Sequence, residues 1–255
     1  MTSAFFILHA LPVIARFRSV PQSRARHRQE EPAKVAHVIH SGEPRRRTPE
    51  IVGPPEHDLD HAAKRRPAKG EVMTVHVVNR RRTTVAASHP GALIADVTSR
   101  GPEPWVRFSP FYPHGGIPVP YSPGVESASV EGIWQALKVF RGTGIDVGKL
   151  GVTSMKGLKR TVRKHGEVVG HRTGIEGSEL LAYEQARRQI YLPSYRWVLE
   201  NRLADLIGEL RDASTERDIV LLDYTTNGEV ENLSKPLSHA ALLRSHLTGE
   251  WPWAL

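Results

Sequence analysis

Short apolar runs and longer helical periods alternate along the chain from residue 73 onward. The apolar runs predict strands at residues 75–78, 92–97, 105–108 and 219–224. Apolar spacing near 3.6 predicts helices over about 129–140, parts of 146–165, 178–210 with an interruption at Pro193, and 236–247. Residues 109–124 are dense in Pro and Gly, which predicts a loop. This order of elements predicts an α+β fold, a mainly helical single domain with a small sheet, over residues 73–255.

Residues 1–72 differ from the rest in composition. They are rich in Pro, Arg and His and show no sustained helical or strand period after Ile14. Too little apolar surface is present to offset the entropy of ordering them, so a disordered extension is expected. Residues 5–14 are apolar, but no basic segment precedes them and no small-residue cleavage site follows, which argues against a secretory signal. Because patterning begins at Met73, one hypothesis is that Met73 is the natural start and that residues 1–72 are not translated.

Composition narrows the classes of function. The net charge is +8, but residues 1–72 hold 13 Lys/Arg against 8 Asp/Glu, so most of the excess lies there and is weak evidence for nucleic-acid binding by the folded part. The chain has no cysteine, which excludes disulfides and thiolate metal sites and suits a cytoplasmic location. No apolar run approaches the roughly 20 residues that span a bilayer, so no membrane partner is expected.

One predicted helix gathers three polar side chains that could carry chemistry. At about 100° per residue, Glu131, Gln135 and Lys138 fall in one narrow sector. Ser127 or Ser129 could cap this helix at its start. The opposite sector is apolar and suits burial against a core; it holds Val130, Ile133, Leu137 and Phe140. The alternative is an ordinary solvated polar face, which spacing alone does not exclude.

Two short blocks resemble a known family. Residues 108–112 read Phe-Ser-Pro-Phe-Tyr, and residues 129–138 carry Ser-x-Glu-x-x-x-Gln-Ala-x-Lys. Together they resemble the NADAR family over roughly residues 105–245. The resemblance implies a hydrolase of N-glycosidic bonds, acting on ADP-ribosylated guanine bases or on phosphoribosylated intermediates of riboflavin synthesis. This chain departs from the family at Gly132, where many members carry His, and at Asn227, which replaces an acid and lacks a following Trp-Gly pair.

Cleavage of an N-glycosidic bond develops positive charge on the ribose and negative charge on the departing base. Glu131 is the principal candidate, because a carboxylate can stabilise the ribose or activate a water. Lys138 could attack an opened sugar as an amine or balance a phosphate. Asp223, at the end of a predicted strand, could assist, or could instead serve a turn or a helix cap.

The residues expected to bind substrate are Ser109, Phe111, Tyr112, Trp134, Gln135, Asn227 and His239. Tyr112 and Trp134 could stack on a nucleobase, although Trp134 borders the apolar face and fits a plain core residue better. His239 could be an acid, a base or a partner for Asp223, and structural use of a lone His is common. Arg187, Arg188 and Arg196 are interpreted as a charged helix face rather than a phosphate clamp.

No metal and no cofactor is expected. Six of the 13 His lie in residues 1–72, and the other seven show no His-x-x-x-His spacing. The leading hypothesis is therefore a hydrolase of a ribosylated or ADP-ribosylated nucleobase, with a nucleotide or modified DNA or RNA as its partner. Two alternatives stay open: a non-catalytic protein that binds ADP-ribose or nucleotides, and a nucleic-acid-associated factor with a basic stripe across residues 156–202.

Overall fold

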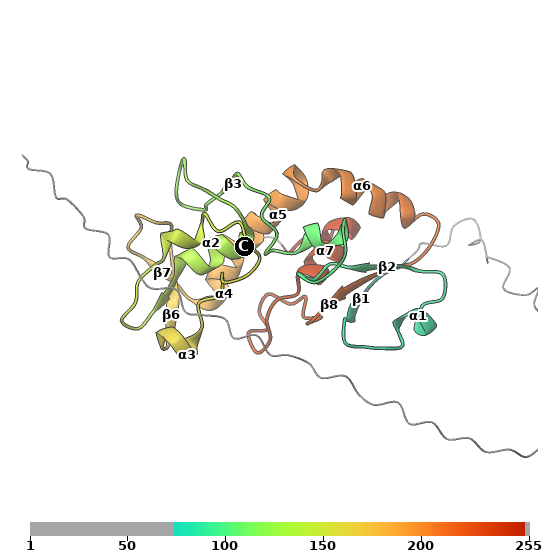
Figure 1. Cartoon of the computed structure of the whole chain (residues 1–255), viewed down its shortest axis with the longest axis horizontal. Helices are drawn as coiled ribbons and strands as arrows, with labels where there is room; N and C mark the ends of the chain where they lie inside the picture. The colour runs from blue at the N-terminus through green and yellow to red at the C-terminus, as the bar shows by residue number, and fades with distance from the viewer. Residues whose placement is uncertain (1–73, 253–255) are drawn as a thin grey trace, which may run out of the picture. The chain divides into compact units, whose positions relative to one another are not determined.

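A computed structural model describes residues 74–252, which fold around a three-stranded parallel sheet (Figure 1). Its strands are β1 (Val75–Asn79), β2 (Leu93–Asp96) and β8 (Ile219–Asp223), in the order β1-β8-β2. The last strand in sequence is thus the central one, and its residues Ile219, Val220 and Leu221 are fully buried. In register, Asn79 pairs with Asp223 and Asp96 with Leu222, so the carboxyl ends of all three strands meet at one edge.

Two small antiparallel sheets complete the β-structure. One pairs β3 (Ile117–Pro118) with β4 (Glu126–Ser127), and the other has the order β5-β6-β7. The strands of the latter are β5 (Lys138–Phe140), β6 (Val168–Arg172) and β7 (Leu180–Leu181). In Figure 1, α2, β6 and β7 lie at one end of the described domain, and β1, β2 and α1 lie at the other.

The helices hold more residues than the strands do. The α-helices are α1 (Val85–Ser88), α2 (Val130–Leu137), α3 (Val162–His165), α4 (Tyr183–Ala186), α5 (Leu192–Asn201), α6 (Ala204–Ala213) and α7 (His239–Thr248). Short 3-10 helices are η1 (Trp105–Phe108) and η2 (Val147–Lys149), and η3 (Arg187–Tyr191) is a π-helical turn. The α+β fold, mainly helical with small sheets, is confirmed. The hypotheses about residues 1–72 fall outside the described residues.

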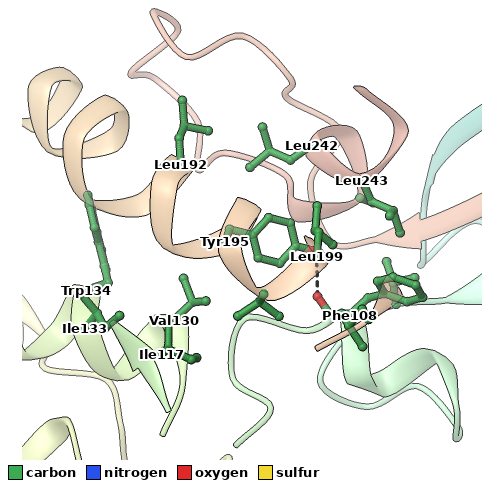
Figure 2. Packing of buried hydrophobic residues seen from close by; sticks show 14 of the residues in the cluster. Phe108, Ile117, Val130, Ile133, Trp134, Leu192, Tyr195, Leu199, Leu242 and Leu243 are labelled. Carbon is green, nitrogen blue, oxygen red and sulfur yellow. Dashed lines mark hydrogen bonds between the residues drawn. The ribbon is translucent and has the colours of Figure 1, made fainter. Parts of the chain in front are cut away.

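One apolar core joins the sheet to the helices (Figure 2). Helix α7 packs against β1 and β8, α6 packs against α7, and α5 contacts α2. At the centre lies Tyr195, which is fully buried and donates its hydroxyl hydrogen bond to the Phe108 carbonyl at 2.8 Å. This bond satisfies the polar end of an otherwise apolar ring and ties α5 to η1.

The predicted strand at residues 105–108 is wrong, because these residues form the 3-10 helix η1. Pro104 immediately precedes it and has no N–H to give to a sheet ladder. Instead, the amides of Val106 and Arg107 donate to the carbonyls of Pro102 and Pro104. The apolar alternation that suggested a strand still buries Val106 and Phe108.

The helix expected over residues 129–140 is shorter than predicted. Ser129 is its cap, accepting a hydrogen bond from the Gly132 amide at 3.0 Å, but the helix ends at Leu137. Lys138 adopts extended backbone angles and begins β5. Lys138 therefore reaches the polar face of α2 from a strand rather than from the last turn of the helix.

The two later helical predictions also need correction. Pro193 does not interrupt the long helical stretch; the break falls between Asn201 and Ala204. Pro193 lies in the first turn of α5, after the π-helical turn that contains Gln189, and an ordinary helix would bring that carbonyl against the proline ring. The last helix begins at His239, three residues later than predicted, because Ser238 caps it by accepting from the Ala241 amide.

Within residues 74–252, none of the helices combines the length and the apolar character that crossing a membrane requires.

The close approach of α2 to its neighbours requires glycine at position 132. A Cβ there would lie 2.9 Å from the Lys149 carbonyl oxygen, which is backbone and cannot swing away. We expect Gly132→Ala to lower the free energy of unfolding by about 1–3 kcal/mol through this overpacking. Gly208→Ala is the matched control, because a Cβ at this position within α6 would meet no atom within 4 Å. It should stabilise by about 0.5–1 kcal/mol, and urea unfolding of both variants checks the contrast.

Candidate functional site

A cavity of about 660 Å³ opens at the carboxyl edge of the parallel sheet. Thr98 and Ser99, which follow β2, form one part of its wall, and Asp223 and Tyr224, at the end of β8, form another. Helix α2 contributes the facing wall. Parallel sheets commonly bind ligands beyond the carboxyl ends of their strands, because loops from several strands converge there.

The polar face of α2 enters this cavity as a hydrogen-bonded chain of three side chains. Gln135 Nε2 donates to Glu131 Oε1 at 2.7 Å, and Lys138 Nζ donates to Gln135 Oε1 at 3.3 Å. The Arg160 amide also donates to Gln135 Oε1 at 2.8 Å. Since a backbone N–H can only donate, this bond fixes the orientation of the Gln135 amide and directs its NH₂ group to Glu131.

Burial shifts the two charged ends of this chain toward neutrality. Glu131 is 7% exposed, and burial raises the pKa of its carboxyl, against the hydrogen bond from Gln135 and the charges of Lys159 and Lys138. Burial likewise lowers the pKa of Lys138; the charge of Glu131 opposes this, and those of Arg160 and Lys159 add to it. Groups with pKa values moved toward neutral pH are suited to exchange protons with a substrate.

A second carboxyl in the same cavity is held in the opposite state. Asp223 Oδ2 lies 3.0 Å from His239 Nδ1 and accepts the Ser238 hydroxyl at 2.8 Å, while Oδ1 accepts the Tyr224 amide at 2.6 Å. Burial alone would raise the pKa of Asp223, but His239 and these donors lower it below its ordinary value. Asp223 therefore stays ionised in the cavity.

His239 is engaged at both ring nitrogens, since Nε2 lies 2.8 Å from the Val97 carbonyl. Burial lowers the pKa of His239, yet the Asp223 carboxylate and the Val97 carbonyl outweigh it and raise the pKa above the ordinary value. An imidazole between two acceptors is best satisfied as the cation. His239 thus serves as the partner of Asp223, one of the roles that the sequence had left open.

An aromatic wall adjoins Glu131. Trp134 is 9% exposed and packs on His171, with ring centroids 3.8 Å apart, while Tyr183 and Tyr191 meet it edge-on. Burial, and secondarily the charge of Lys138, lowers the pKa of His171 to about 3, so His171 is a neutral support for the indole. Trp134 belongs to the core as expected and also lines the cavity.

All but two of the predicted site residues line the cavity; those that do are Glu131, Lys138, Asp223, Ser109, Phe111, Trp134, Gln135 and His239. Ser109 is buried, and its hydroxyl accepts the Phe111 amide at 3.3 Å, which shapes the loop before α2. Tyr112 lies outside the lining and packs on His114. Asn227 also lies outside it, where its amide donates to the Asn232 and Lys235 carbonyls and its side-chain oxygen accepts from Glu229.

Two buried arginines also line the cavity. The sequence did not point to Arg160, and it placed Arg187 on a charged helix face. Arg160 donates to the carbonyls of Gln135, Lys138 and Gly144. Arg187, expected on a charged helix face, is 2% exposed and donates to the carbonyls of Val230, Asn232 and Lys235. Their partners lie 16–48 residues away in sequence, so no local pattern signals them.

Tyr191 also lines the cavity, although it is not among the site residues expected from the sequence. Burial, followed by the charges of Glu131 and Asp223, raises the pKa of Tyr191 well above its ordinary value. Its hydroxyl therefore keeps its proton and can donate a hydrogen bond to a ligand near both carboxyls. The π-helical turn η3 carries Arg187 and Tyr191 to the cavity, and such turns often mark functional sites.

The lining as a whole favours an anionic, aromatic ligand. Its cations are Lys138, Lys159, Arg160, Arg187 and Lys235, besides His239, and its acids are Glu131 and Asp223. Within residues 74–252, no three His, Asp or Glu side chains gather as a metal site would require. The excess of cations beside aromatic rings is typical of sites for phosphorylated nucleosides.

Comparison with known proteins gives one match. The family described as Family of unknown function (DUF6939) matches residues 78–243. The chain belongs to the DUF6939 family. This DUF6939 match covers β2, α2 and β8 and continues through Asp223 and His239, so it includes every residue that lines the cavity. No curated protein and no solved structure matches the chain.

The Asp223–His239 pair should dominate the pH dependence of stability. We expect Asp223→Ala to cost about 3–5 kcal/mol of unfolding free energy, because it leaves a buried cation unpaired. Since the pKa of Asp223 is lowered from 3.8, its contribution to stability is present above pH 3.8 and is lost as the pH falls through the pKa of the folded protein. Since the pKa of His239 is raised from 6.5, its contribution is present below 6.5 and lost as pH rises through the folded value.

The measurement is urea unfolding across pH for the wild type, Asp223→Ala and the double variant Asp223→Asn with His239→Gln. The difference in unfolding free energy between the wild type and the double variant should be largest between pH 3.8 and pH 6.5. A difference that grows steadily above 6.5 would contradict the assigned charge state of His239.

Proposed function

We propose that the protein hydrolyses an N-glycosidic bond in a ribosylated or ADP-ribosylated nucleobase. The observation that carries this proposal is a pair of carboxyls in one cavity whose environments shift their pKa values in opposite directions. The pKa of Glu131 is raised and that of Asp223 is lowered, and the charges of both carboxyls raise the pKa of the Tyr191 hydroxyl. Two carboxyls separated in this way can divide the roles of proton carrier and fixed negative charge.

In the proposed reaction the bond between the anomeric carbon and the base nitrogen breaks as water adds to that carbon. Glu131, with its raised pKa, carries the proton between the attacking water and the departing base. Asp223 stays ionised and stabilises the positive charge that develops on the ribose. The products are the free base and a sugar with a hydroxyl at the anomeric carbon.

Gln135 and Lys138 support these roles. Gln135 holds Glu131 through its NH₂ group and is itself fixed by Arg160, so the carboxyl keeps one position. Lys138 provides a cation two side chains away from Glu131, suited to an oxygen of the sugar phosphate. Trp134 and Phe111 supply aromatic surface for the base.

The proposal agrees with the expected resemblance to the NADAR family, because residues of both blocks that carry it, around Ser109 and around Glu131, line the same cavity. Gly132 departs from that family where α2 approaches Lys149, away from the polar chain. Asn227 departs in a loop outside the lining. We also propose a cytoplasmic location, in keeping with the lack of cysteine.

The deciding experiment is release of free base or ADP-ribose from DNA carrying ADP-ribosylated guanine, alongside ribosylated pyrimidines of the riboflavin pathway. Glu131→Gln keeps the acceptor for Gln135 but cannot carry the proton, so release should fall by about 10²–10⁴-fold. Glu209→Gln, an exposed change on α6 outside the cavity, is the control and should keep full activity. Saturable ADP-ribose binding without release by the wild type would instead support a non-catalytic binding protein.

The same variant should gain stability at neutral pH. The pKa of Glu131 is raised from 4.5, so the cost of its ionised, buried form appears as pH rises through the folded value. Glu131→Gln removes that cost, and its melting temperature should exceed that of the wild type at neutral pH and match it near pH 4.5. Glu209→Gln should shift the melting temperature at neither pH, and a destabilised Glu131→Gln at neutral pH would refute the assignment.

A further inference from the structure

A second cavity, of about 650 Å³, adjoins the first. Ser99, Phe111, Lys159 and Tyr224 line both, so the two share a wall. The remaining lining residues are Arg81, Arg100, Met155, Lys156, Gly157 and Leu158. A ligand held beside Glu131 could thus extend past Phe111 and Tyr224 into this second space.

The second cavity is lined by cations without acidic residues beside them in the described part of the chain. Its charged lining residues are Arg81, Arg100, Lys156 and Lys159. Within residues 74–252, the side chains of Arg81, Arg100 and Lys156 make no hydrogen bond and no ion pair.

Some exposed or half-buried arginines elsewhere in the domain have carboxylate partners. Arg80 binds Asp96 at 2.6 Å, and Arg141 binds Glu167 at 2.8 Å. Cations gathered at one concave site without counter-charges repel one another, and a polyanionic ligand relieves that repulsion. Four cations in one concave lining, with no acid among its described residues, therefore favour a ligand with several negative charges.

The rings at the junction of the two cavities add a second kind of contact. Lys159 Nζ lies 5.3 Å from the centroid of the Phe111 ring, and Arg80 Cζ lies 5.7 Å from that of Tyr224. Tyr224 is 39% exposed and can offer its ring to a ligand. Exposed aromatic rings among cations are the arrangement that binds single strands, since bases stack on the rings while phosphates meet the cations.

We propose that the second cavity binds the phosphodiester backbone of a single-stranded nucleic acid whose modified nucleotide enters the first cavity. This inference rests on the proposed function only in taking the first cavity as the nucleotide site. A single strand suits the geometry better than a duplex, because a base that reacts inside a protein pocket has to leave the stack. Phe111 and Tyr224 would contact the nucleotides on either side of the junction.

The test is fluorescence anisotropy of a labelled single-stranded oligonucleotide across a salt series, using the full chain. The variant Arg100→Gln with Lys156→Gln removes one cation from each of two segments that line the cavity. Each phosphate contact on a single strand contributes about 0.7 to the slope of log affinity against log salt, so the slope should fall in magnitude by about 1.4. At roughly 0.1 M salt this corresponds to about a 25-fold loss of affinity.

The matched control is Arg211→Gln with Arg217→Gln. Both residues are exposed, Arg211 near the end of α6 and Arg217 just before β8, at the opposite end of that strand from Tyr224. The control makes the same change of net charge and should leave affinity and slope unchanged. Because every variant keeps residues 1–72 with their excess of Lys and Arg, the comparison cancels any binding by that segment.

Equal losses in the two double variants would overturn the inference, since net charge alone would then explain the binding. Binding of the oligonucleotide no tighter than that of a free nucleoside diphosphate would also overturn it. Hydrolysis of a ribosylated mononucleotide without oligonucleotide binding would leave the proposed function standing and remove this inference. Site-dependent oligonucleotide binding without hydrolysis of any substrate would support this inference while the proposed function fails.

Discussion

The buried contact between Asp223 and His239 holds together the three segments on which the cavity depends. Asp223 ends the central strand of the sheet, His239 begins α7, and Val97, which accepts from His239, follows β2. Ion pairs of this kind add little net stability, because the cost of removing both charges from water offsets their attraction. Their value here is geometric: the pair fixes where the carboxyl ends of β2 and β8 lie relative to α7. It also keeps one cavity carboxyl ionised whatever ligand is present.

A similar role falls to Gln135 on the facing wall. Its amide accepts from Arg160 and Lys138 and donates to Glu131, so a neutral side chain sets the positions of two charged ones. Arg160 in turn holds the end of α2 and the start of β5 through the Gln135 and Lys138 carbonyls. The termination of α2 at Leu137 is therefore part of the site, because it brings Lys138 round to the same cavity while freeing carbonyls that Arg160 can bind.

The sequence was most informative where the deciding interactions are local. Strands β1 and β8 agree with the predicted ranges to within one residue, and the Ser129 cap and the polar face of α2 follow from spacing. Local propensity failed at residues 105–108, where proline removed ladder donors, and at Lys138, where pairing with His171 in β6 ended the helix. The buried positions of Arg160 and Arg187 were not predicted, because their acceptors are backbone carbonyls from distant segments and any residue type supplies a carbonyl. Patterns of side chains therefore anticipate the reactive groups of this site better than the groups that hold them.

The electrostatics of the cavity follow from this division. Arg160 and Arg187 each donate hydrogen bonds to three backbone carbonyls. Their charges are therefore fixed in a buried setting where solvent screens them weakly. The charge of Arg160 adds to the burial that lowers the pKa of Lys138, and the charge of Glu131 only partly opposes it. An anionic ligand would oppose it further and so raise the pKa of Lys138. The buried arginines thus favour an anion in this cavity, and Arg160 also lowers the pKa of the amine beside it. The site therefore combines a rigid hydrogen-bonded frame with two groups, Glu131 and Lys138, whose pKa values are moved toward neutral pH.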